Sequence, residues 1–247
     1  MLKDALICAL HGFSTGAESF NDLALPDLWA PSLSGHGPTP TMDARCFEDE
    51  VRRLISAIEE RSAGAPVQLL GYSMGARLAI GLLTEAPHLF SSALLIGANP
   101  GLESNEQREE RRRWEREWEA LLIQEGIDVF VTRWQKQAIF ATQKALPAQV
   151  LETQQRKRKR HTAAGLAYAM RVLGLGNMPN YWPRLNQLQI PVNWLVGSAD
   201  DKFLTIARRA TQLNASFDLV ELPEVGHNPL LESPQEVRRL ILSGRSA

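Results

Sequence analysis

The chain has 247 residues, of which 44% are hydrophobic and 22% are charged, and its formal net charge is −1. These values are ordinary for a globular protein with one large core, and the small net charge gives no support to nucleic acid as a partner. The apolar runs are too short to span a bilayer, and the amino terminus does not resemble a secretory signal, so we expect a cytoplasmic protein without membrane insertion. Two cysteines and five histidines show no metal-binding spacing, and we expect neither a metal nor a cofactor.

Short apolar runs alternate with amphipathic segments along most of the chain. Strands are predicted at residues 5–10, 67–70, 93–96, 192–196 and 217–222, and helices at 47–61, 75–86, 203–213 and 234–243. This alternation is typical of an α/β protein with a mostly parallel sheet and helices on both faces.

The alternation fails between residues 99 and 185, where the sequence contains helical patterns and no strand-like run. We call this stretch the helical insertion. Because it separates two predicted strands, we expect it to cover the carboxyl edge of the sheet, where open α/β sheets bind ligands. The predicted organisation is a core of residues 1–98 and 186–247, with residues 99–185 inserted in it as a lid.

The segment from Gly71 to Gly75 reads Gly-Tyr-Ser-Met-Gly and joins a predicted strand to a predicted helix. A serine between two glycines at such a turn is typical of a nucleophile elbow, which holds the hydroxyl of Ser73 out at the carboxyl edge of the sheet. The turn is so sharp that a side chain at either glycine would collide with the neighbouring helix or strand. Short motifs recur by chance, so the pattern alone leaves an ordinary strand-to-helix connection open.

A second loop, which begins with His11, Gly12 and Phe13, follows the first predicted strand. It can aim the backbone N–H of Phe13 at the same position as the N–H of Met74. Two such donors would form an oxyanion hole, which stabilises a negative charge that develops on a substrate oxygen. An ordinary glycine-containing turn is the alternative interpretation.

An acid and a base follow two later strands. The loop after residues 192–196 contains Asp200 and Asp201, and the loop after residues 217–222 contains His227. The order Ser, Asp, His, each after a strand, matches the triad of α/β-hydrolases. Asp200 and Asp201 compete for the acidic role, and we favour Asp200. His36, in a turn-rich loop before the elbow, is assigned a structural role.

Arginines are the main feature of the helical insertion. At about 100° per residue, Arg111 shares one helical stripe with Trp114, Trp118 and two leucines, so it is expected to face inward. An inward guanidinium needs an anion, either an internal carboxylate or the substrate. The same two alternatives apply to Arg77, one turn after Ser73.

The basic run at residues 156–161 is typical of a solvated face, although one member can still point into the cleft. Trp134 is more typical of a packed interior than of a substrate-binding wall. Together the arginines predict a covered pocket for a small molecule with more than one carboxylate.

The chain resembles the 2-succinyl-6-hydroxy-2,4-cyclohexadiene-1-carboxylate synthases of menaquinone and phylloquinone biosynthesis, which are α/β-hydrolases in fold. The motifs that carry the resemblance are His11-Gly12-Phe13, residues 71–77, 99–102, the Arg111…Trp118 helix, Trp134…Gln137…Phe140, Arg160…Gly165-Leu166-Ala167, residues 200–203 and 226–228. The resemblance implies a lyase that eliminates pyruvate from 2-succinyl-5-enolpyruvyl-6-hydroxy-3-cyclohexene-1-carboxylate. Ser73, Asp200 and His227 would then act as a general base without forming an acyl-enzyme.

The same resemblance implies a substrate-binding set. Arg77, Arg111 and Arg160 would hold the carboxylates of the substrate, and Tyr72 and Trp134 would line the site. The expected partner is a small polycarboxylate, and the expected state is a monomer or a weak oligomer.

The sequence departs from the family pattern in three places. Glu115 stands for the acidic residue of the lid helix, Ala76 stands where glycine is usual, and only ten residues precede His11. We therefore expect the first strands of the fold to be shortened or absent. The alternative function is a carboxylesterase, thioesterase or C–C bond hydrolase that uses Ser73 as a nucleophile. A ligand receptor on a hydrolase scaffold is a third possibility.

Overall fold

The computed structural model describes residues 6–243, which form one parallel sheet, the helices that pack on it and a helical insertion. The strands are β1 (Ile7–Leu10), β2 (Leu28–Trp29), β3 (Val67–Tyr72), β4 (Phe90–Ile96), β5 (Val192–Gly197) and β6 (Phe217–Leu222). The α-helices are α1 (Phe47–Ser62), α2 (Met74–Glu85), α3 (Asn105–Trp134), α4 (Ala148–Arg158), α5 (Ala163–Leu173), α6 (Asp201–Leu213), α7 (Pro229–Glu232) and α8 (Pro234–Ser243). Short 3₁₀ helices are η1 (Ala17–Leu23), η2 (Pro87–Leu89), η3 (Ala138–Ala145) and η4 (Trp182–Gln187).

The sheet has the order β2-β1-β3-β4-β5-β6, and every neighbouring pair of strands is parallel. The predicted α/β class and each predicted strand are confirmed, except that residue 5 lies outside the described residues. Strand β2 was not predicted, because its two residues are too few for an alternating pattern and pair only with β1. Within residues 6–243, β1 is the first strand and none is antiparallel.

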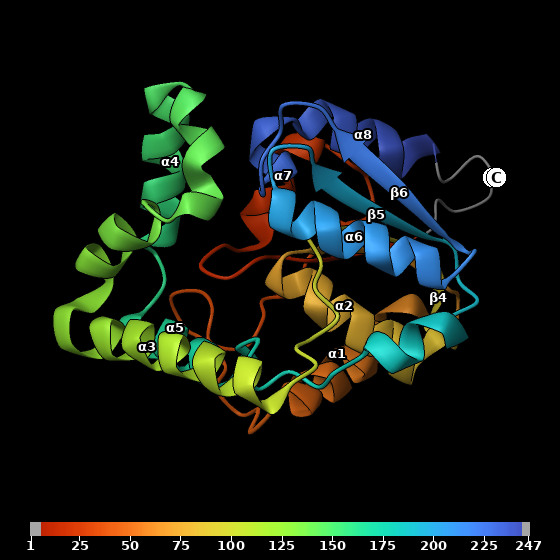
Figure 1. Cartoon of the computed structure of the whole chain (residues 1–247), viewed down its shortest axis with the longest axis horizontal. Coiled ribbons are helices and arrows are strands. Elements are labelled where there is room, and N and C mark those ends of the chain that lie inside the picture. The colour runs from red at the N-terminus through yellow and green to blue at the C-terminus, as the bar shows by residue number, and fades with distance from the viewer. Residues whose placement is uncertain (1–5, 244–247) are drawn as a thin grey trace.

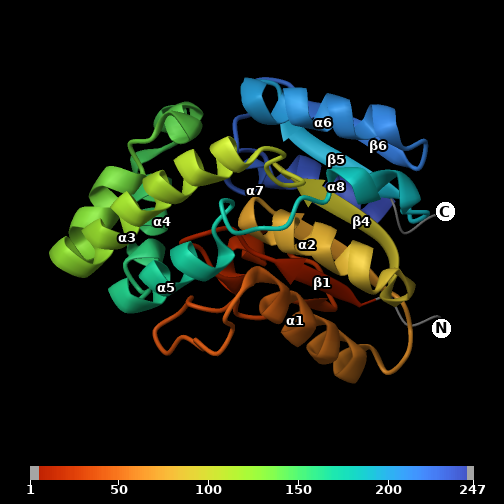
Figure 2. The same ribbon diagram turned by 60° about the horizontal axis from the view of Figure 1, so that its bottom comes forward.

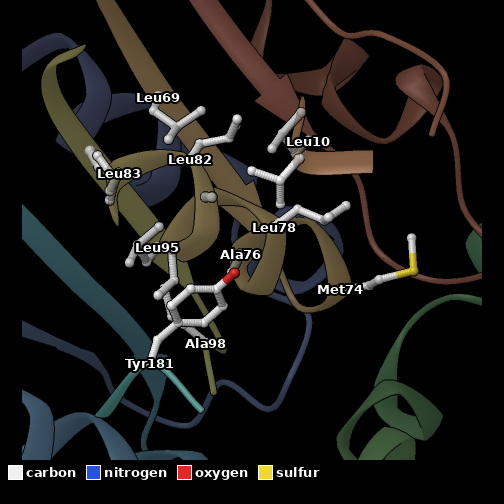
Figure 3. Packing of buried hydrophobic residues seen from close by; sticks show 14 of the residues in the cluster. Leu10, Leu69, Met74, Ala76, Leu78, Leu82, Leu83, Leu95, Ala98 and Tyr181 are labelled. Atoms are coloured by element: carbon white, nitrogen blue, oxygen red, sulfur yellow. The ribbon is translucent and has the colours of Figure 1, made fainter. Parts of the chain in front are cut away.

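Alternate residues of the strands face two separate cores, because successive side chains of a strand point to opposite faces of the sheet. Cys8 and Leu10 of β1 belong to a core with residues of α1, α2 and α6, whereas Ile7 and Ala9 belong to a core with residues of η1 and α8. Figure 3 shows the first of these cores, in which leucines of α2 lie against leucines of the strands. Helices therefore cover both faces of the sheet, as predicted.

Helices alone connect β4 to β5, and Figures 1 and 2 both place α3, α4 and α5 beside the sheet rather than on either of its faces. The long helix α3 begins at a capping box: Ser104 accepts the N–H of Gln107, and the Gln107 side chain accepts the N–H of Ser104. It bends at Gly126, whose φ of 78° is outside the helical region. Among residues 6–243, no helix combines the length and the apolar character that a membrane crossing requires.

Candidate active site

Ser73 occupies a strained turn between β3 and α2. Its φ of 52° and ψ of −106° are unusual for a residue with a side chain, and its N–H is held by the carbonyl of Ile96 at 2.8 Å. A Cβ atom at Gly75 would lie 2.0 Å from the carbonyl oxygen of Leu10, and one at Gly71 would lie 2.7 Å from the Cα of Ala76. Glycine at both places is thus required by close packing, which is the geometry of a nucleophile elbow.

Three side chains from distant segments meet at this turn. The hydroxyl of Ser73 lies 2.9 Å from Nε2 of His227, and Nδ1 of His227 lies 2.6 Å from Oδ2 of Asp200. His227 and Asp200 are 3% and 9% exposed, so the carboxylate can orient the imidazole with little competition from water. Asp201 is exposed and is the first residue of α6, so the structure places Asp200 rather than Asp201 beside the imidazole.

Aromatic rings enclose the imidazole of His227. The ring of Phe203 lies 4.4 Å from it and the ring of Tyr72 lies 5.8 Å from it, measured between centroids. Burial raises the pKa of the Tyr72 hydroxyl, which therefore stays protonated. These contacts keep the base in one orientation and limit its access to solvent.

The loop after β1 lies opposite the start of α2. Phe13 and Met74 both line the cavity in front of Ser73, and neither backbone N–H has a hydrogen-bond partner among the described residues. The ring of Phe13 packs edge-on against Trp134 and Phe130, at centroid distances of 5.1 and 6.1 Å. The two N–H groups are thus in the region where an oxyanion hole is expected.

The cavity has a volume of about 530 Å³ and lies between the carboxyl edge of the sheet and the helical insertion. Its wall carries four cationic side chains, Arg77, Arg111, Arg158 and Lys202, and we call the first three the cavity arginines. The same wall carries the carboxylates of Glu115, Asp200 and Asp201, of which Glu115 pairs with Arg111 and Asp200 with His227. Arg77, Arg158 and Lys202 form no ion pair among the described residues, so the cavity is suited to an anionic molecule.

Arg77 donates from Nη1 to the carbonyl of Leu173 at 2.8 Å and forms no ion pair among residues 6–243. Burial, with a contribution from the positive charge of Arg111, lowers its pKa to about 10. The guanidinium is still charged at neutral pH. The sequence left two partners open for Arg77, an internal carboxylate or the substrate. The described residues provide no internal carboxylate for it.

Arg111 has an internal carboxylate as its partner. Its Nε donates to Oε1 of Glu115 at 2.8 Å, and its guanidinium lies over the ring of Trp114. Glu115 is 3% exposed and also accepts the N–H groups of Leu175 and Gly176. The buried carboxylate thus fixes Arg111 and ties α3 to the loop after α5.

The structure contradicts the prediction for Arg160. That side chain is exposed and does not line the cavity, whereas Arg158 is 2% exposed and does. Arg158 is the last residue of α4, and its guanidinium lies over the ring of Phe140. On α4 it lies two turns after Leu151, on the same side of the helix. The shared stripe was the feature of the sequence that could have indicated the inward position of Arg158. The basic run by itself does not show which of its side chains is buried.

The guanidinium of Arg158 is poorly satisfied. Its Nε and Nη1 atoms are buried and have no hydrogen-bond partner among the described residues, and burial lowers its pKa to about 10. A buried charge without a partner is costly unless a ligand supplies one.

Lys202, for which no role was predicted, also lines the cavity. It follows Asp200 and Asp201 directly, and burial lowers the pKa of its amine. Its position next to the predicted triad acid was the feature of the sequence that could have indicated a place in the site. Trp134, in contrast, both belongs to the packed interior of the helical insertion and lines the cavity, so the two interpretations of this residue are compatible.

Comparisons with known proteins agree with this geometry. The profile described as Alpha/beta hydrolase family matches residues 7–240. A 2-succinyl-6-hydroxy-2,4-cyclohexadiene-1-carboxylate synthase of Yersinia pestis is 32% identical over 208 residues, which are 82% of this chain and 71% of the relative. The synthase of the same name from Pectobacterium atrosepticum is 29% identical over 93% of this chain and 88% of its own length.

The solved structure of MenH from S. aureus superposes with a TM-score of 0.92 at 27% identity, covering 98% of this chain and 94% of that one. The similarity therefore extends through the helical insertion as well as the sheet. The chain belongs to the α/β-hydrolase family and, within it, to the 2-succinyl-6-hydroxy-2,4-cyclohexadiene-1-carboxylate synthases.

Proposed function

We propose that this protein is a lyase of menaquinone or phylloquinone biosynthesis. It eliminates pyruvate from 2-succinyl-5-enolpyruvyl-6-hydroxy-3-cyclohexene-1-carboxylate and gives 2-succinyl-6-hydroxy-2,4-cyclohexadiene-1-carboxylate. The observation that carries the proposal is the hydrogen-bonded series Ser73–His227–Asp200 facing a cavity with three guanidinium groups. The names of the relatives from Yersinia pestis and Pectobacterium atrosepticum support the same reaction.

The chemistry follows from the difference between the two compounds. Formation of the 2,4-diene requires loss of the proton on C2, a shift of the C3=C4 double bond to C2=C3, formation of C4=C5, and cleavage of the C5–O bond to the enolpyruvyl group. C2 carries the succinyl ketone, so the negative charge left by the proton is shared with the carbonyl oxygen. Catalysis therefore needs a base near C2 and donors near that oxygen.

Ser73 and His227 supply the base. Nε2 of His227 takes the proton of the Ser73 hydroxyl, and the alkoxide then removes the proton on C2, which restores the hydroxyl. The proton held by His227 neutralises the departing enolpyruvate, which becomes pyruvate. Asp200 stabilises the imidazolium throughout, and no covalent intermediate is formed.

The substrate carries three carboxylates, on the ring, on the succinyl chain and on the enolpyruvyl group. Arg77, Arg111 and Arg158 are the matching set in the cavity, and the N–H groups of Phe13 and Met74 are the donors for the succinyl carbonyl. Two of these arginines come from the helical insertion, which we propose acts as a lid on the core formed by residues 1–98 and 186–247. The cytoplasmic location and the monomeric or weakly oligomeric state remain predictions.

To test the proposal, purified protein is added to the enolpyruvyl substrate, and the release of pyruvate is measured with a coupled dehydrogenase. We expect stoichiometric release of pyruvate, and mass spectrometry of the quenched enzyme should show unmodified Ser73. Rapid hydrolysis of small esters with an acyl group trapped on Ser73, and no pyruvate release, would instead establish the hydrolase alternative.

A further inference from the structure

Three buried histidines form a cluster next to the loop of Phe13. The rings of His11 and His36 lie 4.9 Å apart and those of His36 and His161 lie 5.4 Å apart, in edge-to-face contact. Their exposed fractions are 0%, 1% and 6%. They come from three separate places: the loop after β1, the turn-rich loop of residues 32–37, and the helical insertion just before α5. We call them the histidine cluster.

Each ring accepts a backbone N–H from another segment. Leu33 donates to Nε2 of His11 at 3.2 Å, Ser14 donates to Nε2 of His36 at 3.2 Å, and Gly37 donates to Nδ1 of His161 at 2.8 Å. An accepting ring nitrogen cannot carry a proton. All three histidines must therefore be neutral, and the tautomer of each is fixed.

The remaining nitrogens agree with this assignment. Nδ1 of His11 donates to the carbonyl of Gly12 at 2.9 Å, and Nδ1 of His36 donates to the carbonyl of Ser34 at 3.1 Å. Nε2 of His161 carries the proton of that ring and is buried without a partner among the described residues. Burial lowers the pKa of all three imidazoles, that of His11 to about 4.

The bond from Ser14 to His36 lies next to the donor that the reaction needs. Ser14 directly follows Phe13, and its φ of 58° is a left-handed conformation that a side chain disfavours. The ring of Phe13 also meets the ring of His36 edge-on at 5.6 Å. His36 thus holds both the backbone after Phe13 and the phenyl ring itself, which leaves the N–H of Phe13 little freedom.

We propose that His36 and His161 are positioning residues for the elimination: neutral His36 fixes the loop that presents the N–H of Phe13, and neutral His161 locks the helical insertion onto the loop that carries His36. This inference rests on the proposed function for the identity of the reaction. The N–H of Phe13, which these histidines would position, could stabilise the oxyanion of any reaction in which one develops.

Charged groups around the cluster lie mostly at its margin. Glu50 of α1 is fully buried, accepts the N–H and hydroxyl of Ser34 and pairs with Arg53. Glu18 of η1 faces His161 and favours its charged form, while Arg158 and Arg160 oppose it. None of these charged side chains forms a hydrogen bond with a ring of the cluster, so the rings depend on backbone groups for their partners.

The direction of the pH dependence follows from the lowered pKa values. Below about pH 6.5 the unfolded chain binds protons at these histidines that the folded chain does not, so folding stability is full above that pH and falls as the pH drops. A proton on Nε2 of His36 would also face the N–H of Ser14 and break that bond. We therefore expect the loop of Phe13 to loosen in acid.

The test compares two substitutions at His36. Gln can place its oxygen where Nε2 lies and cannot be protonated, whereas Leu fills similar space without an acceptor. We expect His36→Leu to lower kcat at least tenfold with KM changed less than threefold, and His36→Gln to recover most of kcat. The acid-induced fall in thermal stability should also be smaller in His36→Gln than in the wild type, because one of the three titrating rings is gone.

A parallel pair tests His161, where the oxygen of Asn can replace Nδ1. We expect His161→Leu to raise KM at least fivefold, since the helical insertion carries two of the cavity arginines, and His161→Asn to stay within twofold of the wild type. If both leucine variants fold and keep the wild-type kcat and KM, the inference is wrong.

Amide hydrogen exchange of residues 11–16 gives a readout that needs no substrate. Exchange at Ser14 should be at least tenfold faster in His36→Leu than in the wild type, and near wild-type in His36→Gln. This separates the two proposals: wild-type protein that releases no pyruvate would overturn the proposed function alone. Equal exchange in the wild type and His36→Leu would overturn the inference alone.

Discussion

The triad and the cavity arginines face the same space but are built differently. In the triad, His227 forms a hydrogen bond with Ser73 on one side and with Asp200 on the other. The three residues lie in the turns and loops that follow β3, β5 and β6. Among the cavity arginines, Arg77 donates to one carbonyl, and Arg158 has two buried nitrogens with no hydrogen-bond partner in the described part of the chain. The core thus completes its own catalytic geometry, whereas Arg77 of the core and Arg158 of the helical insertion retain donors that a carboxylate substrate can use. The helical insertion therefore supplies two of the three cavity arginines and none of the triad side chains.

The largest expected effect is at the triad acid. Asp200→Asn should lower kcat by about 10²- to 10⁴-fold, because the amide no longer stabilises the imidazolium and favours the wrong tautomer. Steady-state pyruvate release measures this loss. Asp201→Asn is the matched control, since Asp201 is adjacent but exposed, and it should stay within twofold of the wild type. Equal losses in both variants would show that the adjacent acid, and not Asp200 alone, serves the imidazole.

The second comparison is between two arginines of one basic run. Arg158→Met should raise KM at least tenfold, about 1.4 kcal/mol, because a substrate carboxylate loses its partner. It should also raise the midpoint of thermal unfolding, because it removes a buried charge for which the described residues provide no ion pair. Arg160→Met should change neither quantity appreciably, since that side chain is exposed. The kinetics and a thermal melt of each variant check the prediction. Loss of both affinity and stability in Arg158→Met would mean that the residue mainly supports packing.

A smaller effect is expected at the carboxylate that fixes Arg111. Glu115→Gln should lower the free energy of unfolding by about 1.5–3 kcal/mol, the usual range for hydrogen bonds to a charged group, and raise KM three- to fivefold. Urea unfolding and substrate titration measure the two changes. Glu117→Gln on the exposed face of the same helix is the control. A stability loss with an unchanged KM would separate Arg111 from substrate binding.

The smallest effect is expected at Trp134. Trp134→Phe should change kcat and KM by less than threefold, because the indole N–H has no hydrogen-bond partner within residues 6–243 and a phenyl ring keeps the stacking on Phe130. Trp134→Ala should do more, since it leaves a cavity in the interior of the helical insertion. A large effect of the phenylalanine variant would indicate that the indole N–H binds substrate.

By itself the sequence determined the α/β class, the elbow and the three triad segments. Each depends on local patterns: apolar alternation within a strand, glycines that a five-residue turn requires, and polar residues placed just after strand ends. The helical insertion was also recognisable, because 87 residues without a strand pattern interrupt an otherwise regular alternation, and the elements between β4 and β5 are all helices. These features are encoded by neighbours along the chain.

Only the tertiary structure decided which side chains meet. It placed Asp200 rather than Asp201 beside His227, turned Arg158 rather than Arg160 into the cavity, and brought His36 and His161 together across more than a hundred residues. Strand β2 likewise exists only through its pairing with β1. Adjacent polar residues have the same local preferences, and the packing of distant segments selects the one that is buried.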